Sequence, residues 1–496
     1  MTHAPQPVDL LIVHGTLITV DPARRVIEDG ALAVAGERIV AVGSSAELIA
    51  RYTARKTLNA RRKAVLPGLI DCHGHAGHGL LKTLGGGDSE AWMEACRVIY
   101  TTGSDEDFWY AEAALAALER LKCGTTTGVC LFGGGDSIMR VDDPRYAARH
   151  CAAIAEAGIR SFLAVGPSRP PAPRTYATWD GGQRRDRDVS WDEMRACCEE
   201  IVRTQHGTRD GRVNICIELP VYQPQYRPDH LEFARTFREQ AAQYGDLARS
   251  HRLGLTQDGH RAGTLQLARD ELGLLGANAF MSHSIDLTPG DIEACVATGT
   301  SIVHNPSAIM SIRGRCPVPE LIDAGVTVAL GSDGIAPDRS YDMFRHMFQC
   351  MHYHRRHFRD PGVLPHGKVL EMVTIDAARA LGLEREIGSL EAGKKADIIL
   401  VDLFKPHLMP LNMPVYRVTS FANGADVSTT IVNGRILMED GKVLTVDETV
   451  VMERAQAATD LMLERTGLAH LLESPARLWQ ATHYDPQVPR ERTGER

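Results

Sequence analysis

The chain has 496 residues, of which 44% are hydrophobic and 24% are charged, and its formal net charge at pH 7 is −8. This length accommodates a barrel-sized domain together with a smaller one. The negative charge argues against nonspecific binding of nucleic acid, which requires a basic surface. No run of roughly 18 or more apolar residues predicts a membrane-spanning helix.

The N-terminal sequence MTHAPQPVDLLIVHG lacks the basic and apolar regions of a secretory signal. The 11 cysteines show no disulfide-framework spacing, because Cys197 and Cys198 are adjacent and no C-x-x-C motif occurs. These features predict reduced thiols in a cytoplasmic protein. The expected partners are small-molecule substrates, without nucleic acid or membrane.

The first 66 residues are expected to contribute short β-strands to a small domain. Residues 9–15 (DLLIVHG), 31–36 (ALAVAG) and 38–43 (RIVAVG) are apolar and β-branched, and Gly and Asp interrupt the series. Gly36 and Glu37 fall between two of these runs, as a hairpin turn requires.

Residues 67–385 alternate short apolar runs with longer helical patterns. Residues 106–124 (EDFWYAEAALAALERLKCG), for example, place apolar side chains at helical spacing and end in glycine. Eight strand candidates occur in this part of the chain, with helical stretches between most of them. This alternation predicts a parallel (β/α)8 barrel of the TIM type. Residues 167–190 depart from it, because they are rich in Pro, Gly and charge, and we expect a long loop there.

A second series of strand-like runs follows the predicted barrel. Residues 396–403 (ADIILVDL) are a strand candidate, and residues 427–444 contain two strand-like runs around Asn433-Gly434, a strong hairpin signal. We therefore predict that both chain ends build one small β-sandwich domain beside the barrel. The predicted divisions are 1–66 and 386–445 for this domain, 67–385 for the barrel, and 446–496 for a C-terminal helix followed by a disordered tail.

Three histidines occur in LIDCHGHAGHG (residues 69–79), at the end of the first predicted barrel strand. His73 and His75 are two residues apart, so both side chains can face one point on an extended segment. The C-terminal ends of barrel strands are also where barrel enzymes place their chemistry. A metal site and a hydrogen-bonded polar pair both remain open for these two residues. His78 lies beyond the pair and is expected to support the pocket.

Later strand ends carry further side chains that can bind metal or transfer protons. One histidine after a strand is commonly an ordinary, partly exposed side chain. A series of such groups at successive strands of one barrel favours a shared metal site. In chain order they are Gln257, Asp258 and His260, then His283, His304 and Asp333.

These motifs resemble those of the amidohydrolase superfamily. PGLIDCHGH is similar to the superfamily signature. The blocks MSHSIDLTPGDIEACVATGTSIVHNPSA and AGVTVALGSDG are similar to those of its cytosine-deaminase and triazine-hydrolase branch. GSLEAGKKADIILVDL is similar to the return into the small β domain. The resemblance covers roughly residues 9–445 and suggests a homo-oligomer.

The resemblance implies a role for each matching residue. His73 and His75 match the first two metal ligands, and Asp333 matches the last ligand, which also accepts the proton of the attacking water. His283 matches the histidine that contacts this water or the substrate oxygen, and His304 more naturally supports the pocket. The fourth strand, VNICIELPV, has no lysine that could bridge two metals. One divalent ion per subunit is therefore expected, with zinc preferred and iron, manganese or cobalt as alternatives.

The fifth strand departs from the family pattern. The branch usually carries His-x-x-Glu there, where this chain has Gln257, Asp258, Gly259 and His260. Either Gln257 is a weak oxygen ligand, or the loop shifts and His260 binds the metal. We prefer His260, because neutral imidazole is the stronger ligand for a borderline metal.

The expected reaction is hydrolysis of a carbon–nitrogen bond by metal-activated water, with Asp333 and His283 as catalytic residues. Deaminases of heterocycles must also protonate a ring nitrogen, which the family's glutamate does. Because histidine replaces that glutamate, we expect a small urea, carbamate or amide substrate, as in the phenylurea and thiocarbamate hydrolases. The alternative is a deaminase or dechlorinase of a purine, pyrimidine or triazine. A non-enzymatic scaffold is a minor alternative.

The sequence gives few signals for the residues that contact the substrate. Trp92 is either a wall for an aromatic group or part of a helix core. Arg313 and Arg315 either hold a substrate carboxylate or carbonyl, or are structural arginines. The candidate pocket residues are Trp92, His304, Arg313 and Arg315.

Overall fold

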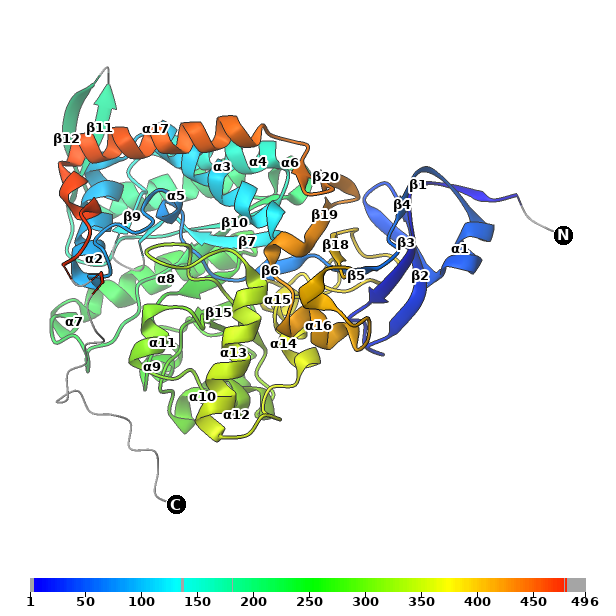
Figure 1. Cartoon of the computed structure of the whole chain (residues 1–496). Helices are drawn as coiled ribbons and strands as arrows, with labels where there is room; N and C mark the ends of the chain where they lie inside the picture. The colour runs from blue at the N-terminus through cyan, green and yellow to red at the C-terminus, as the bar shows by residue number, and fades with distance from the viewer. Residues whose placement is uncertain (1–3, 135–137, 181, 477, 480–496) are drawn as a thin grey trace.

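The computed structural model of the chain describes residues 4–134, 138–180, 182–476 and 478–479. Figure 1 shows a barrel surrounded by helices, with a second sheet beside it on the side of the N-terminus. All 11 cysteines lie in the described part of the chain and are free thiols. Within those ranges, no helix is both long and apolar enough to cross a bilayer.

Eight parallel strands form the barrel, and they are the eight strands that the sequence predicts. A backbone hydrogen bond of 3.1 Å from Cys72 N to Leu330 O links the ends of the first and last strands. Every residue of the second strand, TTTGVCL, is buried, as expected for a parallel strand covered on both faces. The predicted (β/α)8 barrel is therefore confirmed. The strands are β6 (Leu69–Asp71), β7 (Thr125–Leu131), β10 (Arg160–Val165), β13 (Val213–Glu218), β14 (Leu255–Gln257), β15 (Ala279–Ser282), β16 (Ser301–His304) and β17 (Val328–Leu330).

Helices follow the strands and cover the outside of the barrel (Figure 1). Their ends carry recognisable caps: the Asp105 side chain accepts from Phe108 N at the start of α3, and a Thr288–Asp291 capping box opens α10. The helices of the barrel are α2 (Ser89–Val98), α3 (Glu106–Lys122), α4 (Pro144–Ala157), α5 (Trp191–Gln205), α6 (Thr208–Gly211), α7 (Asp229–Glu232), α8 (Ala234–His251), α9 (Thr264–Asp270), α10 (Pro289–Thr298), α11 (Ile309–Arg313), α12 (Val318–Asp323), α13 (Met343–Phe358), α14 (His366–Met372) and α15 (Ile375–Ala380).

A layer of buried side chains fills the barrel interior beneath the carboxyl ends of the strands. It combines Ile70, Val129, Phe280 and Ala329 from separate strands with Ala377 of α15. Side chains from opposite strands can touch in this way only inside a closed barrel. The polar residues that follow the strands therefore rest on an apolar floor.

Nine strands from both chain ends form the second sheet, which confirms the predicted two-ended β domain. Asn433 and Gly434 have φ angles of 48° and 72° and join β19 to β20, so the predicted hairpin is confirmed. Two short helices, α1 (Ser45–Arg51) and α16 (Pro414–Ser420), accompany this part of the chain. The strands are β1 (Gln6–Ile18), β2 (Val26–Ala35), β3 (Arg38–Ser44), β4 (Tyr52–Asn59), β5 (Lys63–Pro67), β18 (Ile398–Asp402), β19 (Val427–Val432), β20 (Arg435–Glu439) and β21 (Lys442–Val443).

The segment 167–190, expected to be a loop, contains an antiparallel hairpin instead. β11 (Arg174–Asp180) pairs with β12 (Gln183–Val189). The buried Arg140 side chain donates to Ala177 O at 2.8 Å and holds the hairpin to the barrel. Almost all of β12 is exposed, so its charged composition resembled that of a loop. A small additional pair, β8 (Gly133–Gly134) and β9 (Ile138–Met139), precedes this hairpin in the chain.

The C-terminal helix α17 (Glu448–Thr466) lies along α3 (Figure 1), and its position in the chain matches the predicted helix. Ion pairs of 2.6 Å between Arg465 and Asp105 and of 2.7 Å between Arg454 and Asp107 join the two helices. The tail predicted to be disordered falls largely on residues 480–496, which lie outside the described residues.

Candidate active site

Five side chains meet at the carboxyl ends of the barrel strands: His73, His75, Asp258, His283 and Asp333, called here the convergent group. His75 Nε2 lies 3.1 Å from Asp333 Oδ1, and His283 Nε2 lies 2.9 Å from Asp258 Oδ1. His73 Nε2 lies between the carboxylates, 3.4 Å from Asp258 Oδ1 and 3.5 Å from Asp333 Oδ1. Imidazole nitrogens and carboxylate oxygens this close together form a donor set for a divalent metal.

The backbone at the strand ends positions these side chains. Asp333 and His283 both have a φ of 60°, an uncommon conformation that turns each residue out of its strand direction. Asp333 N donates to His73 O at 2.9 Å, so the ends of β6 and β17 are fixed together. The His75 ring is oriented by its Nδ1, which donates to Gly133 O at 3.0 Å and leaves Nε2 facing the group.

A buried ion pair lies directly behind the convergent group. Asp71 Oδ2 is 2.9 Å from Arg120 Nη2, and neither side chain is exposed. Asp71 also accepts hydrogen bonds of 2.8 Å from the backbone nitrogen and the hydroxyl of Ser332. Because Ser332 precedes Asp333, these contacts fix the loop that carries the catalytic candidate.

The electrostatics of the convergent group favour ionised carboxylates. Burial raises the pKa of Asp333, but Arg339 and His283 outweigh this effect and hold the pKa well below its usual range. Burial likewise raises the pKa of Asp258, and His283 and His73 hold it well below its usual range. Two ionised carboxylates, Asp333 buried and Asp258 partly buried, provide the negative charge that a divalent cation requires.

The residues at the end of the fifth strand are arranged differently from our preferred sequence interpretation, in which His260 binds the metal. His260 lies outside the convergent group, and its Nδ1 is 2.9 Å from Thr264 Oγ1. Gln257 is also outside, because its Nε2 donates to Pro220 O at 2.9 Å. Asp258 instead enters the group, since it is the first residue beyond the paired part of β14. The sequence signal for Asp258 was its position directly after the strand.

Two of the four candidate pocket residues, Trp92 and Arg313, line a cavity of about 820 Å³ above the convergent group. Trp92 contacts the edge of the His78 ring, which stacks on His75 at 4.5 Å between centroids. His78 Nδ1 is 3.1 Å from Tyr100 Oη, so His78 supports the pocket wall as expected.

The other two candidates do not line this cavity. His304 is fully buried beside His354, and Arg315 forms an ion pair with Glu320. Sequence reasoning also missed Arg339, whose Nη1 is 3.3 Å from Asp333 Oδ2. No motif marked it, because it follows Asp333 through an irregular loop.

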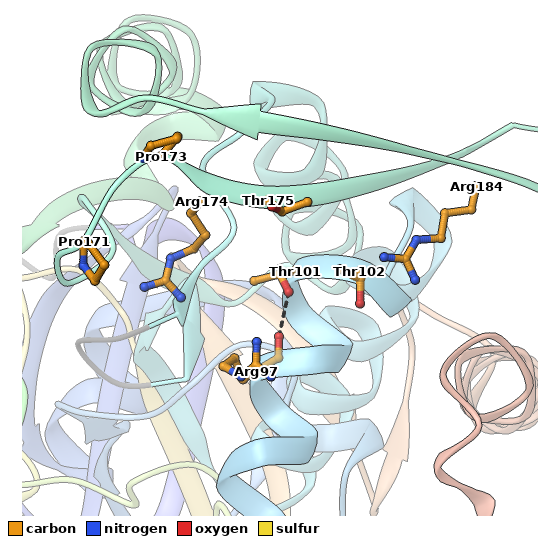
Figure 2. A pocket seen from close by; sticks show the side chains of 8 residues that line it. All are labelled: Arg97, Thr101, Thr102, Pro171, Pro173, Arg174, Thr175 and Arg184. Atoms are coloured by element: carbon orange, nitrogen blue, oxygen red, sulfur yellow. Dashed lines mark hydrogen bonds between the residues drawn. The ribbon is translucent and has the colours of Figure 1, made fainter.

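A neighbouring pocket of about 340 Å³ lies between the α2 end and the β11–β12 hairpin (Figure 2). Its residues Arg97, Pro171 and Arg174 also line the larger cavity, so the two spaces adjoin. Arg97 pairs with Glu94, and Arg184 pairs with Asp186 at 2.6 Å. Carboxylates therefore neutralise two of the arginines that line this pocket.

Comparisons with protein families and curated proteins cover almost the whole chain. A model of the amidohydrolase family matches residues 64–437, and a model of the bacterial imidazolonepropionase-like composite domain matches residues 30–54. A 5-methylthioadenosine/S-adenosylhomocysteine deaminase of Syntrophobacter fumaroxidans is 31% identical over 90% of this chain and 97% of its own length. A 5'-deoxyadenosine deaminase of Methanosarcina mazei is 30% identical over 92% of this chain and 99% of its own length.

Solved structures show the same fold. An adenosine deaminase from Xanthomonas campestris with bound zinc superimposes with a TM-score of 0.76 at 24% identity, over 93% of this chain and 100% of that chain. The zinc complex of an atrazine chlorohydrolase from Arthrobacter aurescens superimposes with a TM-score of 0.74 at 21% identity, over 91% of this chain and 100% of that chain. Both comparisons extend over the barrel and the second sheet.

Proposed function

The chain belongs to the amidohydrolase family, and we propose that it is a metal-dependent aminohydrolase that releases ammonia from a small amino-substituted heterocycle, with adenine nucleosides as the first candidates. Family membership confirms the sequence resemblance and the expectation of a hydrolase acting on carbon–nitrogen bonds other than peptide bonds. The observation that carries the proposal is the convergent group at the floor of the cavity.

The relatives favour the alternative substrate class over the urea, carbamate or amide that we preferred from the sequence. The two curated relatives above are deaminases of adenosine derivatives. The preference for a urea depended on the missing glutamate and on His260 as a metal ligand. His260 lies outside the convergent group, whereas Asp258 and Asp333 supply two carboxylates beside the reacting position. The expected homo-oligomer stays a prediction.

We infer that the convergent group would hold one divalent ion, with zinc preferred. His73 supports this assignment, because neither of its ring nitrogens makes a hydrogen bond of good geometry among the described residues, although the side chain is buried. Such nitrogens are costly unless another partner satisfies them. A bound divalent ion would lower the pKa of water to about 7 and polarise the substrate.

Asp333 is the proposed proton carrier. Its Oδ1 faces the histidines, while its Oδ2 lies 3.3 Å from Nη1 of Arg339, whose positive charge favours the ionised carboxylate. An ionised carboxylate in this position can accept a proton from the attacking water and pass it to the ring nitrogen. It can then carry the proton of the added hydroxyl to the amino nitrogen, which leaves as ammonia. His283 lies 3.6 Å from the same carboxylate and can donate a hydrogen bond to the oxygen of the attacking water as it adds to the ring. The cavity volume suits a single heterocyclic substrate.

Zinc-loaded protein is expected to release ammonia from adenine nucleosides or aminotriazines. The test offers these compounds beside aryl ureas, carbamates and amides, and quantifies ammonia and organic amine separately. Ammonia that increases with enzyme concentration supports the proposal. Organic amine without ammonia would contradict it and restore the urea or carbamate interpretation.

Metal affinity is expected to rise with pH between about 6 and 9. Burial opposes a charge on His73, but Asp258 and Asp333 outweigh it and raise the pKa of this imidazole to about 9 in the metal-free protein. Below about pH 9 the ion must displace a proton from His73. Above that pH the imidazole is already neutral and can bind the ion directly. Competition titrations with a chelator at several pH values measure this dependence. An affinity that is constant after correction for the chelator would exclude His73 as a ligand.

A further inference from the structure

A second cluster of metal-binding side chains is buried beside the barrel, outside the convergent group. His304 ends β16, and Cys350 and His354 lie four residues apart on α13, so they share one helix face. Their ligand atoms all lie within 4.8 Å of one another. The rings of His304 and His354 are 5.4 Å apart between centroids.

The two histidines of this cluster lack the hydrogen bonds that buried polar groups require. His304 and His354 have no exposed surface, and all four of their ring nitrogens are without a hydrogen-bond partner in the described structure. A neutral imidazole has one donor and one acceptor nitrogen, and leaving both unsatisfied in the interior is costly. Two such rings beside one thiol indicate that a ligand binds between the three side chains.

We propose that His304, Cys350 and His354 form a structural site for a transition-metal ion, with zinc as the first candidate. Two imidazole nitrogens and one thiolate are a softer donor set than the convergent group, which contains no sulfur. Binding replaces the thiol proton of Cys350, which passes to solvent, and one nitrogen of each imidazole forms a bond to the ion. No electron transfer is involved.

The charged groups around the cluster are largely paired with one another. Arg315 lies close to His354, and its positive charge disfavours a protonated imidazole there. Arg315 is itself paired with Glu320, with Nη1 at 3.0 Å from Oε2. The positive charge next to the site is therefore largely neutralised.

The site would stabilise the part of the barrel that supports the convergent group. Asn305 follows His304 directly, and its amide donates to Ser282 Oγ at 2.9 Å and lies 3.4 Å from His283 Nδ1. An ion that bonds β16 to α13 would restrain this segment from outside the barrel. The proposed role is structural and does not depend on the proposed aminohydrolase activity.

Metal analysis of four forms of the full-length protein tests the proposal. After loading with zinc and desalting, the unmodified protein is expected to hold about two ions per chain, and Cys350→Ser and His73→Asn about one each. The double variant is expected to hold none. One ion in the unmodified protein, retained in Cys350→Ser and lost in His73→Asn, would overturn the proposal.

Cobalt substitution distinguishes the two sites by their ligands. Thiolate-to-cobalt charge-transfer absorption is expected in the unmodified protein and in His73→Asn, because only the buried cluster contains sulfur. Cys350→Ser should lose it. The matched control His150→Gln should keep it, because His150 is equally buried with both ring nitrogens unpartnered but has no such cluster around it among the described residues. Absence of this absorption from His73→Asn refutes the site even if Cys350→Ser fails to fold.

Discussion

Replacing Asp333 with asparagine is expected to reduce kcat/KM for ammonia release by about 100- to 10,000-fold, the range typical of a lost general base. The substitution keeps the size of the side chain and removes the charge that Arg339 and the histidines surround. Because Asp333 is also a proposed ligand, part of the loss is expected to appear as weaker metal binding. Assays at saturating zinc separate the two contributions.

Asp338→Asn is the matched control for this variant. Asp338 lies five residues further along the chain, its side chain is exposed, and it does not belong to the convergent group. It should retain full activity and metal content. If Asp333→Asn keeps activity within about threefold of the unmodified protein at saturating zinc, the assignment of Asp333 as the proton carrier fails.

The order of the barrel strands and most of the convergent group were accessible from the sequence, because both depend on local patterns. Short β-branched runs separated by helical periods lead to one parallel arrangement. His73 and His75 follow from their spacing, His283 from its place directly after β15, and Asp333 from its place three residues beyond the end of β17. The Asn433-Gly434 hairpin likewise follows from a turn that few other sequences adopt.

Other features depend on contacts between distant residues. Arg339 reaches Asp333 through an irregular loop, and a buried arginine holds the β11–β12 hairpin to the barrel. The charged side chains of β12 point to solvent, so composition alone suggested a loop. The family resemblance of the block that contains His304 implied that this residue supports the substrate pocket, but its side chain lies against α13 instead. Strand-end position indicates where a residue is, and the packing around it determines which way the side chain faces.

The end of β14 shows most clearly how packing determines the direction of a side chain. A shift of one residue along this strand changes which side chain reaches the convergent group. Gln257 is still paired with Met281 in the sheet, so its side chain faces Pro220. Asp258 is the first unpaired residue and faces His283 and His73. The sequence alone could not show which side chain reaches the convergent group, because Gln257, Asp258 and His260 lie within four positions.

A pair of variants at this strand end distinguishes the arrangement in the structure from the one preferred on sequence alone. Asp258→Asn is expected to weaken zinc binding by at least about 100-fold, because it removes a charge that lies 2.9 Å from His283 and 3.4 Å from His73. His260→Gln is expected to change zinc affinity by less than about threefold, because the ring bonds Thr264 and not the convergent group. Chelator competition at fixed pH gives both affinities, and circular dichroism checks that each variant is folded. Loss of zinc in His260→Gln together with retention in Asp258→Asn would show that the loop binds the ion through His260, and Asp258 would then be free to act as the proton donor to the ring.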